Sequence, residues 1–170
     1  MTTHHVVLVG LMGSGKTTVG RRLAASLQCP FLDTDEEVER RTGRTVRDIF
    51  TRDGEDAFRV IEHDVLRDAL ATADRSVIAA AGGAVLRHDS RELLKRPNLV
   101  VWLRADSELL IERVGRRRGH RPLLDDDPAT RLRSLAVERD PIYRSVAEYT
   151  IDVDDKSIDE VCDDIVKVMS

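Results

Sequence analysis

Hydrophobic positions along the chain alternate between short continuous runs and helical spacing. Residues 6–9 form a continuous apolar run that a glycine ends, a pattern typical of a strand buried inside a parallel sheet. The next segment places Val19, Leu23 and Leu27 four residues apart, which predicts a helix over residues 16–27 with one apolar face.

The same alternation continues to the end of the chain. Further strands are predicted at 31–33, 76–80, 99–103 and 149–153. Helices are predicted at 36–41, 46–50 and 55–70, from about 106, at 128–146 with a proline in the first turn, and after the capping pair Ser157 and Glu160. Strands alternating with helices predict a single three-layer α/β/α domain over residues 1–170, built around a parallel sheet.

Composition narrows the classes of protein to consider. The chain has 170 residues, of which 41% are hydrophobic and 34% charged, so a soluble globular domain is expected. Its net charge of −4 argues against general nucleic-acid binding. The longest apolar run, 77–86, is too short to span a bilayer, and the N-terminus lacks the charged region of a signal peptide. Two distant cysteines predict neither a disulfide framework nor a zinc site, and we expect a cytoplasmic protein.

One stretch is strongly positive although the chain as a whole carries a net negative charge. Five arginines fall within nine residues, namely Arg113, Arg116, Arg117, Arg118 and Arg121. Such a cationic patch on an acidic protein indicates a small anionic ligand, although a solvated helix face would have the same composition.

The segment Gly10-Leu11-Met12-Gly13-Ser14-Gly15-Lys16-Thr17 matches the phosphate-binding pattern G-x-x-x-x-G-K-[ST] in full, between a predicted strand and a predicted helix. Its glycines let backbone N–H groups turn around phosphate oxygens at the positive end of a helix. Lys16 is expected to reach the β- and γ-phosphates of a nucleotide, and the Thr17 hydroxyl to bind Mg²⁺.

Asp33-Thr34-Asp35 stands where the second predicted strand ends, and open parallel sheets bind their ligands at that edge. One carboxylate could hold the water shell of Mg²⁺ while the other accepts a proton from an attacking hydroxyl. Either aspartate could instead simply cap the following helix.

Three further segments carry candidate chemistry. Arg59 and Glu62 lie one helical turn apart and could pair, as many surface residues do. Gly82-Gly83 follows a strand and would let a ligand approach the backbone closely, although an ordinary turn has the same composition. The pattern R-P-L-L begins at Arg121, and R-x-P-x-Y begins at Arg139.

The order P-loop, D-T-D, G-E-x-x-F-R-x-x-E, G-G, R-P-L-L, R-x-P-x-Y resembles the shikimate kinase family from Val6 to about Val153. The resemblance implies a P-loop kinase domain with a five-stranded parallel sheet, like that of nucleoside monophosphate kinases. It implies transfer of the γ-phosphate of ATP to the 3-hydroxyl of shikimate with Mg²⁺, a step of chorismate and aromatic amino-acid biosynthesis. It also implies a substrate-binding helical region at about 34–62 and a lid at about 114–126.

The resemblance carries roles over to individual residues. ATP would be bound by Gly13, Ser14, Gly15, Lys16, Thr17, Thr18, Arg113, Arg116 and Arg121. Mg²⁺ would be held by Thr17 and, through water, by Asp33. Shikimate would be bound by Asp35, Arg59, Gly82, Gly83 and Arg139. The catalytic residues would be Lys16, the base Asp35 and the lid residue Arg121, which stabilises the transferring phosphate. Either Arg113 or Arg116 would stack on adenine.

One position departs from the family pattern, and other functions stay open. Ala81 stands where the family has the first of three glycines, so we expect an ordinary β-region φ there. The alternatives are a kinase of another cyclitol or of a gluconate-type polyol acid, a nucleoside monophosphate kinase, and a non-catalytic nucleotide-binding protein. The expected partners are ATP and shikimate, with no nucleic acid or membrane, and the expected state is a monomer.

Overall fold

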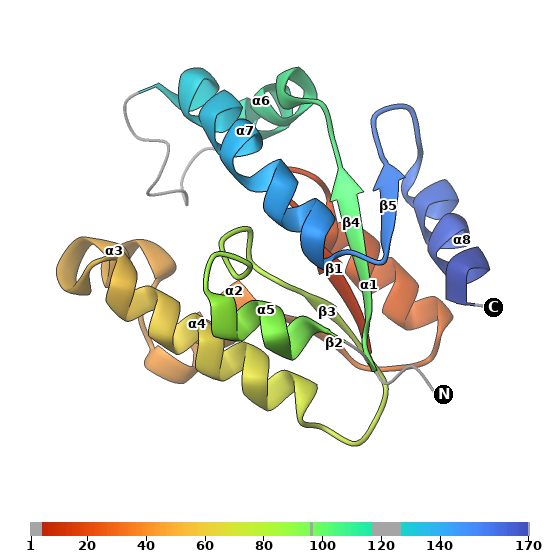
Figure 1. Cartoon of the computed structure of the whole chain (residues 1–170), viewed down its shortest axis with the longest axis horizontal. Coiled ribbons are helices and arrows are strands. Elements are labelled where there is room, and N and C mark those ends of the chain that lie inside the picture. Colours follow the sequence, from red (N-terminus) through yellow and green to blue (C-terminus); the bar gives the residue numbers. More distant parts are fainter. Residues whose placement is uncertain (1–4, 96, 117–126, 170) are drawn as a thin grey trace.

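The computed structural model describes residues 5–95, 97–116 and 127–169. Its five strands are β1 (His5–Val9), β2 (Phe31–Asp33), β3 (Ser76–Ala79), β4 (Leu99–Arg104) and β5 (Tyr149–Asp152). They pair in the order β2-β3-β1-β4-β5, and every pair is parallel. The predicted three-layer fold with a five-stranded parallel sheet is therefore confirmed (Figure 1).

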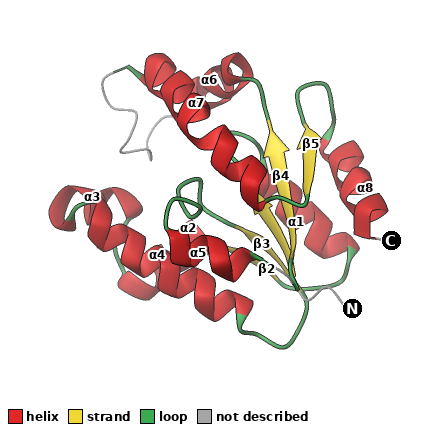
Figure 2. Cartoon of the chain, in the orientation of Figure 1, coloured by secondary structure: helices red, strands yellow, loops and turns green. Residues whose placement is uncertain are grey.

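Helices connect the strands and cover both faces of the sheet (Figure 2). They are α1 (Lys16–Ser26), α2 (Thr34–Thr42), α3 (Val46–Asp53), α4 (Glu55–Leu70), α5 (His88–Leu94), α6 (Ser107–Arg116), α7 (Pro128–Val146) and α8 (Ile158–Met169). The sequence pattern did not indicate α5, a short helix of seven residues after the glycine turn. None of the helices in the described ranges is both long and apolar enough to cross a membrane.

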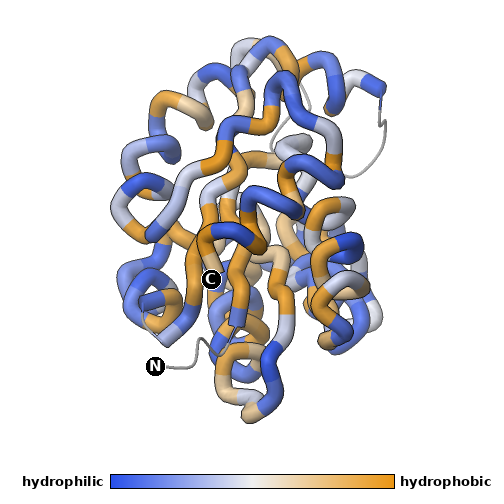
Figure 3. Tube along the Cα trace, turned by 90° about the vertical axis from the view of Figure 1, so that its right-hand side faces the viewer, coloured by the Kyte–Doolittle hydropathy of each residue, from blue (hydrophilic) through white to orange (hydrophobic). Residues whose placement is uncertain are grey.

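The alternating side chains of the strands divide the core between the two faces. Val7, Ile78 and Trp102 point to the face covered by α4, α5, α6 and α7. Leu8 and Val101 point to the opposite face, where α1 and α8 pack. Figure 3 shows the hydrophobic residues concentrated along the strands and the hydrophilic ones toward the outside of the helices. The cysteines Cys29 and Cys162 are both free.

A smaller apolar cluster lies beside the sheet and joins α2, α3 and α4. Its buried members are Val38, Ile49, Phe58 and Val65. This cluster fixes the position of α4 relative to the start of α2. The three helices that connect β2 to β3 are thereby held together beside the same edge of the sheet.

Candidate active site

A cavity of about 660 Å³ lies where the strands end. Every predicted site residue within the described ranges lines it, namely Gly13, Ser14, Gly15, Lys16, Thr17, Thr18, Asp33, Asp35, Arg59, Gly82, Gly83, Arg113, Arg116 and Arg139. These residues come from six separate segments, so the fold brings together motifs that are as far as 126 positions apart, since 139 − 13 = 126. Arg121 and most of the predicted lid lie outside the described residues.

The phosphate-binding loop is shaped by its glycines. Gly10, Gly13 and Gly15 have φ of 144°, 84° and 97°, values that other residues rarely adopt. The Nζ atom of Lys16 donates to the backbone oxygens of Gly10 (2.8 Å) and Leu11 (2.9 Å), so its ammonium group is held against the loop. The loop leads directly into the N-terminus of α1, whose N–H groups and dipole favour anions.

The two carboxylate oxygens of Asp33 accept hydrogen bonds from different segments of the chain. Its Oδ1 accepts from the backbone N–H groups of Asp35 (3.0 Å) and Glu36 (3.3 Å), which caps α2. Its Oδ2 accepts from the Thr17 hydroxyl at 2.6 Å, beside the phosphate-binding loop. The capping bonds hold the carboxylate in place and leave its second oxygen directed at Thr17.

This pair of oxygen donors fits Mg²⁺. Mg²⁺ prefers oxygen ligands, keeps several of its waters and is commonly held by one or two carboxylates together with substrate phosphates. Within the described ranges, no group of three or more His, Cys, Asp or Glu residues could enclose a metal ion by itself. The site therefore suits an ion that arrives with a nucleotide rather than one held by the protein alone.

Asp35 stands in the first turn of α2, facing the cavity. Burial and the neighbouring Asp33 carboxylate raise its pKa to about 6, while Lys16 and Arg59 oppose the rise. A carboxylate with such a pKa is ionised at neutral pH and is a stronger proton acceptor than an ordinary aspartate.

Arg59 reaches the cavity from α4 and is 8% exposed. Its Nη1 donates to both carboxylate oxygens of Glu62 (3.0 and 2.9 Å), and its Nη2 donates to Glu55 (2.9 Å). Burial raises the pKa of Glu62 to about 7, and the charge of Arg59 opposes this rise. The pair suggested by the sequence spacing is formed, and it is buried rather than on the surface.

Arg139 approaches the same place from α7 and is 2% exposed. Among the described residues, no carboxylate lies within ion-pair distance of its guanidinium, and its buried Nε has no hydrogen-bond partner. A buried cation without a paired anion is costly. The arrangement therefore indicates that an anionic ligand completes it.

The glycine turn lies between the two arginines. A Cβ atom on Gly83 would come within 2.2–2.3 Å of the Arg59 guanidinium, and one on Gly82 would lie 3.5 Å from Nη1 of Arg139. Neither glycine has a positive φ, so the space, and not the backbone conformation, requires glycine at position 83. Ala81 likewise has no positive φ, as expected from its side chain.

The nucleotide end of the cavity is lined by two predicted arginines on one side and, on the other, by residues that were not predicted from the sequence. Arg113 donates from Nη1 to the backbone oxygen of Gly13 at 3.1 Å, and Arg116 pairs with Glu112. On the other side, Val153, Lys156, Ile158 and Val161 line the cavity from the end of β5 and the start of α8. This segment could have been predicted, because it directly follows a parallel strand and ligands bind at the ends of such strands.

The chain is similar to known proteins over nearly its whole length. The model of the family described as "SKI: Shikimate kinase" matches residues 12–170. A shikimate kinase of Symbiobacterium thermophilum is 49% identical over 96% of this chain and 94% of its own length. The solved structure of "Shikimate kinase from Acinetobacter baumannii in complex with shikimate" is similar with a TM-score of 0.94 and 41% identity, covering 99% of this chain and 93% of that one. Another similar structure, a shikimate kinase from Aquifex aeolicus, has a TM-score of 0.80 and 32% identity, over 97% of this chain and 95% of that one.

Proposed function

Since this chain belongs to the shikimate kinase family and its activity is phosphoryl transfer from ATP to the 3-hydroxyl of shikimate, we propose specific roles in this reaction for the predicted residues that line the cavity. The activity belongs to the shikimate pathway of aromatic amino-acid biosynthesis. The observation that supports these roles is the position of Arg139, which is buried beside Arg59 and the glycine turn and has no ion pair with any residue that the structure describes.

The acceptor end matches the chemistry of shikimate, which has one carboxylate and several hydroxyl groups. Arg59 and Arg139 bind the carboxylate, because arginine forks pair with carboxylates through two hydrogen bonds. Gly82 and Gly83 expose backbone to the acceptor. Asp35 contacts the hydroxyls, orients the reacting one for in-line attack and accepts its proton. The helical region 34–62 carries Asp35 and Arg59 and serves as the substrate-binding region.

The phosphate end binds ATP. Gly13, Ser14, Gly15 and Thr18 bind its phosphates, and Lys16 leaves the loop carbonyls to neutralise the β- and γ-phosphates. Thr17 and Asp33 hold Mg²⁺, which neutralises phosphate charge when bound. Arg113 and Arg116 border the nucleotide, and one of them stacks on adenine. The segment 114–126 acts as a lid that brings Arg121 to the transferring phosphate; its role stays a prediction.

The protein works as a cytoplasmic monomer that binds ATP and shikimate and requires neither nucleic acid nor a membrane. Its net charge of −4 supports the absence of a nucleic-acid partner. Sedimentation of the pure enzyme with and without ATP tests the oligomeric state, and a dimer in both conditions would contradict it.

A coupled ADP-release assay tests the proposed function. Shikimate, gluconate and AMP are offered in parallel at saturating ATP, with and without Mg²⁺. We expect turnover with shikimate and Mg²⁺ and little with the other acceptors. Preferred turnover of gluconate would contradict the acceptor assignment, and turnover that is unaffected by chelation would contradict the Mg²⁺ requirement.

A further inference from the structure

The glycine turn at 81–83 is held by buried side chains from both sides. The backbone N–H of Ala81 donates to the Thr34 hydroxyl at 2.8 Å, and Thr34 is 1% exposed. On the other side, the Tyr143 hydroxyl donates to the backbone oxygen of Gly82, and Tyr143 is fully buried. The turn therefore has one anchor at the start of α2 and another on α7.

These anchors leave the side of the turn that faces the cavity available to bind a ligand. Within the turn itself, Ala84 N–H donates to the oxygen of Ala81 (2.9 Å) and Leu86 N–H donates to that of Gly83 (3.0 Å). The N–H groups of Gly82 and Gly83 have no hydrogen bond to any residue that the structure describes, and both glycines line the cavity. Gly83 is buried and Gly82 is half-buried. Because buried backbone N–H groups are almost always paired, the N–H of Gly83 above all is suited to a ligand.

Tyr143 connects the turn to an arginine of the acceptor end. It lies one helical turn after Arg139 on α7, and both side chains approach Gly82. Its ring packs against Trp102, with centroids 5.8 Å apart. Burial raises the pKa of the phenol, so the hydroxyl keeps its proton and remains a donor throughout the working pH range.

Thr34 makes the corresponding connection to the aspartates. It stands between Asp33 and Asp35, in the first turn of α2, and its hydroxyl accepts from the turn rather than from its own helix. The position of Asp35 and the position of the turn are therefore linked through the hydrogen bond between Thr34 and Ala81.

We propose that Thr34 and Tyr143 are positioning residues that hold the glycine turn in place for the acceptor. The N–H groups of the turn, Asp35 and Arg139 can then contact the same bound molecule. This inference rests on the proposed function, because it assumes that the acceptor binds against the turn. Neither residue touches the reacting atoms in this arrangement. Each acts through the backbone of residues 81 and 82.

Tyr143→Phe tests one anchor, because it removes the hydroxyl and keeps the ring that packs against Trp102. Loss of the hydrogen bond to the Gly82 oxygen, together with the contact of the hydroxyl with Arg139, predicts a rise in the KM for shikimate of roughly tenfold. The KM for ATP should change by less than about twofold, since the phosphate-binding loop is separate. Tyr149→Phe is the matched control, because Tyr149 is the other tyrosine of the chain and lies on β5 away from the turn. An unchanged shikimate KM in a folded Tyr143→Phe enzyme would overturn this anchor.

Thr34→Val and Thr34→Ser separate the hydroxyl from the shape of the side chain. Valine keeps the shape and leaves the Ala81 N–H unsatisfied, so the shikimate KM should again rise roughly tenfold. Serine keeps the acceptor and should restore the KM to within about threefold. Greater impairment by serine than by valine would assign the effect to the lost methyl packing and overturn this anchor. Thr42→Val is the control, because that hydroxyl bonds to the backbone of Val38 and Arg44 at the other end of α2.

The double variant Thr34→Val/Tyr143→Phe tests whether the anchors act on one turn. Residues that act through the same element have non-additive effects, so its shikimate KM should rise less than the product of the single changes. Independent, multiplicative effects would overturn a shared role. Wild-type turnover in the same assay separates this inference from the proposed function, since only failure of the latter would remove shikimate phosphorylation from the unmodified enzyme.

Discussion

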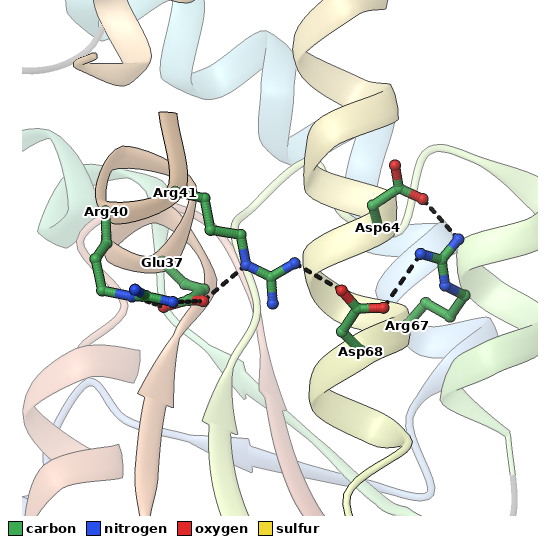
Figure 4. Close-up of polar contacts among 6 residues, drawn as sticks. All are labelled: Glu37, Arg40, Arg41, Asp64, Arg67 and Asp68. Carbon is green, nitrogen blue, oxygen red and sulfur yellow. Dashed lines mark hydrogen bonds and ion pairs between the residues drawn. The ribbon is translucent and has the colours of Figure 1, made fainter. Parts of the chain in front are cut away.

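Helices α2 and α4 carry charged side chains in two different settings. On the outer surface lies a chain of ion pairs, shown in Figure 4 and called here the outer network, whose members are Glu37, Arg40, Arg41, Asp64, Arg67 and Asp68. Facing the cavity are Asp35, Arg59 and Glu62, which together with Arg139 of α7 form the inner cluster.

The same chemical groups behave in opposite ways in these two settings. Hydrogen bonds from Arg40 and Arg41 lower the pKa of Glu37 to about 2, whereas burial raises the pKa of Glu62 to about 7 although it also pairs with an arginine. The side chain of Arg67 is 52% exposed, and that of Arg59 is 9% exposed. Members of the outer network satisfy one another, but the inner cluster contains an arginine without an ionic partner among the described residues. Incomplete pairing, and not the presence of charge, distinguishes the site.

The largest expected effect comes from Asp35→Asn, which keeps the shape of the side chain and cannot accept a proton. Loss of the general base should lower kcat by about 10²–10⁴-fold, with a much smaller change in shikimate affinity. Steady-state kinetics at pH 8 measure both values. Asp64→Asn in the outer network is the control, and its kcat should stay within about twofold of the wild-type value. A greater loss in Asp33→Asn at saturating Mg²⁺ would reverse the roles of the two aspartates.

Arg139→Ala should weaken shikimate binding by roughly 2–5 kcal/mol, because the bound carboxylate would lose its buried partner. Calorimetry with shikimate and, separately, with ATP measures this loss. ATP binding should barely change. The control is Arg67→Ala, which removes an exposed arginine from the outer network and should leave both affinities unchanged. Loss of ATP binding with shikimate binding retained would place Arg139 at the nucleotide.

The parts of the site that local patterns encode could be predicted from the sequence. The phosphate-binding loop is one continuous motif, and Asp33 and Asp35 could be placed at the cavity because parallel strands end at one edge. The fold could also be predicted from local patterns, since strands and helices alternate along the chain with clear periodicity. Short helix α5 was missed because its seven residues include few apolar positions.

What could not be predicted depends on contacts between distant segments. The Arg59–Glu62 spacing allowed a pair, but its burial depends on how α4 packs beside the glycine turn. Gly83 was expected to make room for a ligand, and the structure shows that its missing side chain makes room for the Arg59 guanidinium. Positions of this kind are set by tertiary packing, which a single sequence does not reveal.

Glu62→Gln should change how stability depends on pH, an effect of up to about 3 kcal/mol. The pKa of Glu62 rises from 4.5 to about 7 on folding, so the folded state binds the extra proton and is favoured at low pH. Raising the pH from 5 to 8 should therefore lower the unfolding free energy of wild type relative to Glu62→Gln, as measured by urea denaturation.

The matched control for this prediction is Glu37→Gln. The pKa of Glu37 falls from 4.5 to about 2 on folding, so its contribution is present above pH 4.5 and is lost as the pH falls toward 2. Between pH 5 and 8 the difference between wild type and Glu37→Gln should stay constant. A wild-type advantage over Glu62→Gln that grows with pH would mean that Arg59 outweighs burial.

The smallest effect is expected from Arg41→Gln, which breaks the connection between α2 and α4 in the outer network. Arg41 donates to Glu37 and, across the helices, to Asp68 at 2.7 Å. Its side chain is 33% exposed, so solvent and salt screen both pairs and the loss of stability should be about 0.2–1 kcal/mol. A double-mutant cycle with Asp68→Asn, repeated at high salt, measures the coupling and should show it decreasing. Because the buried cluster of Val38, Ile49, Phe58 and Val65 already fixes α2 against α4, kcat/KM should stay within about twofold. A tenfold loss of kcat/KM would mean that the surface ion pairs, and not this apolar packing, hold Asp35 in place.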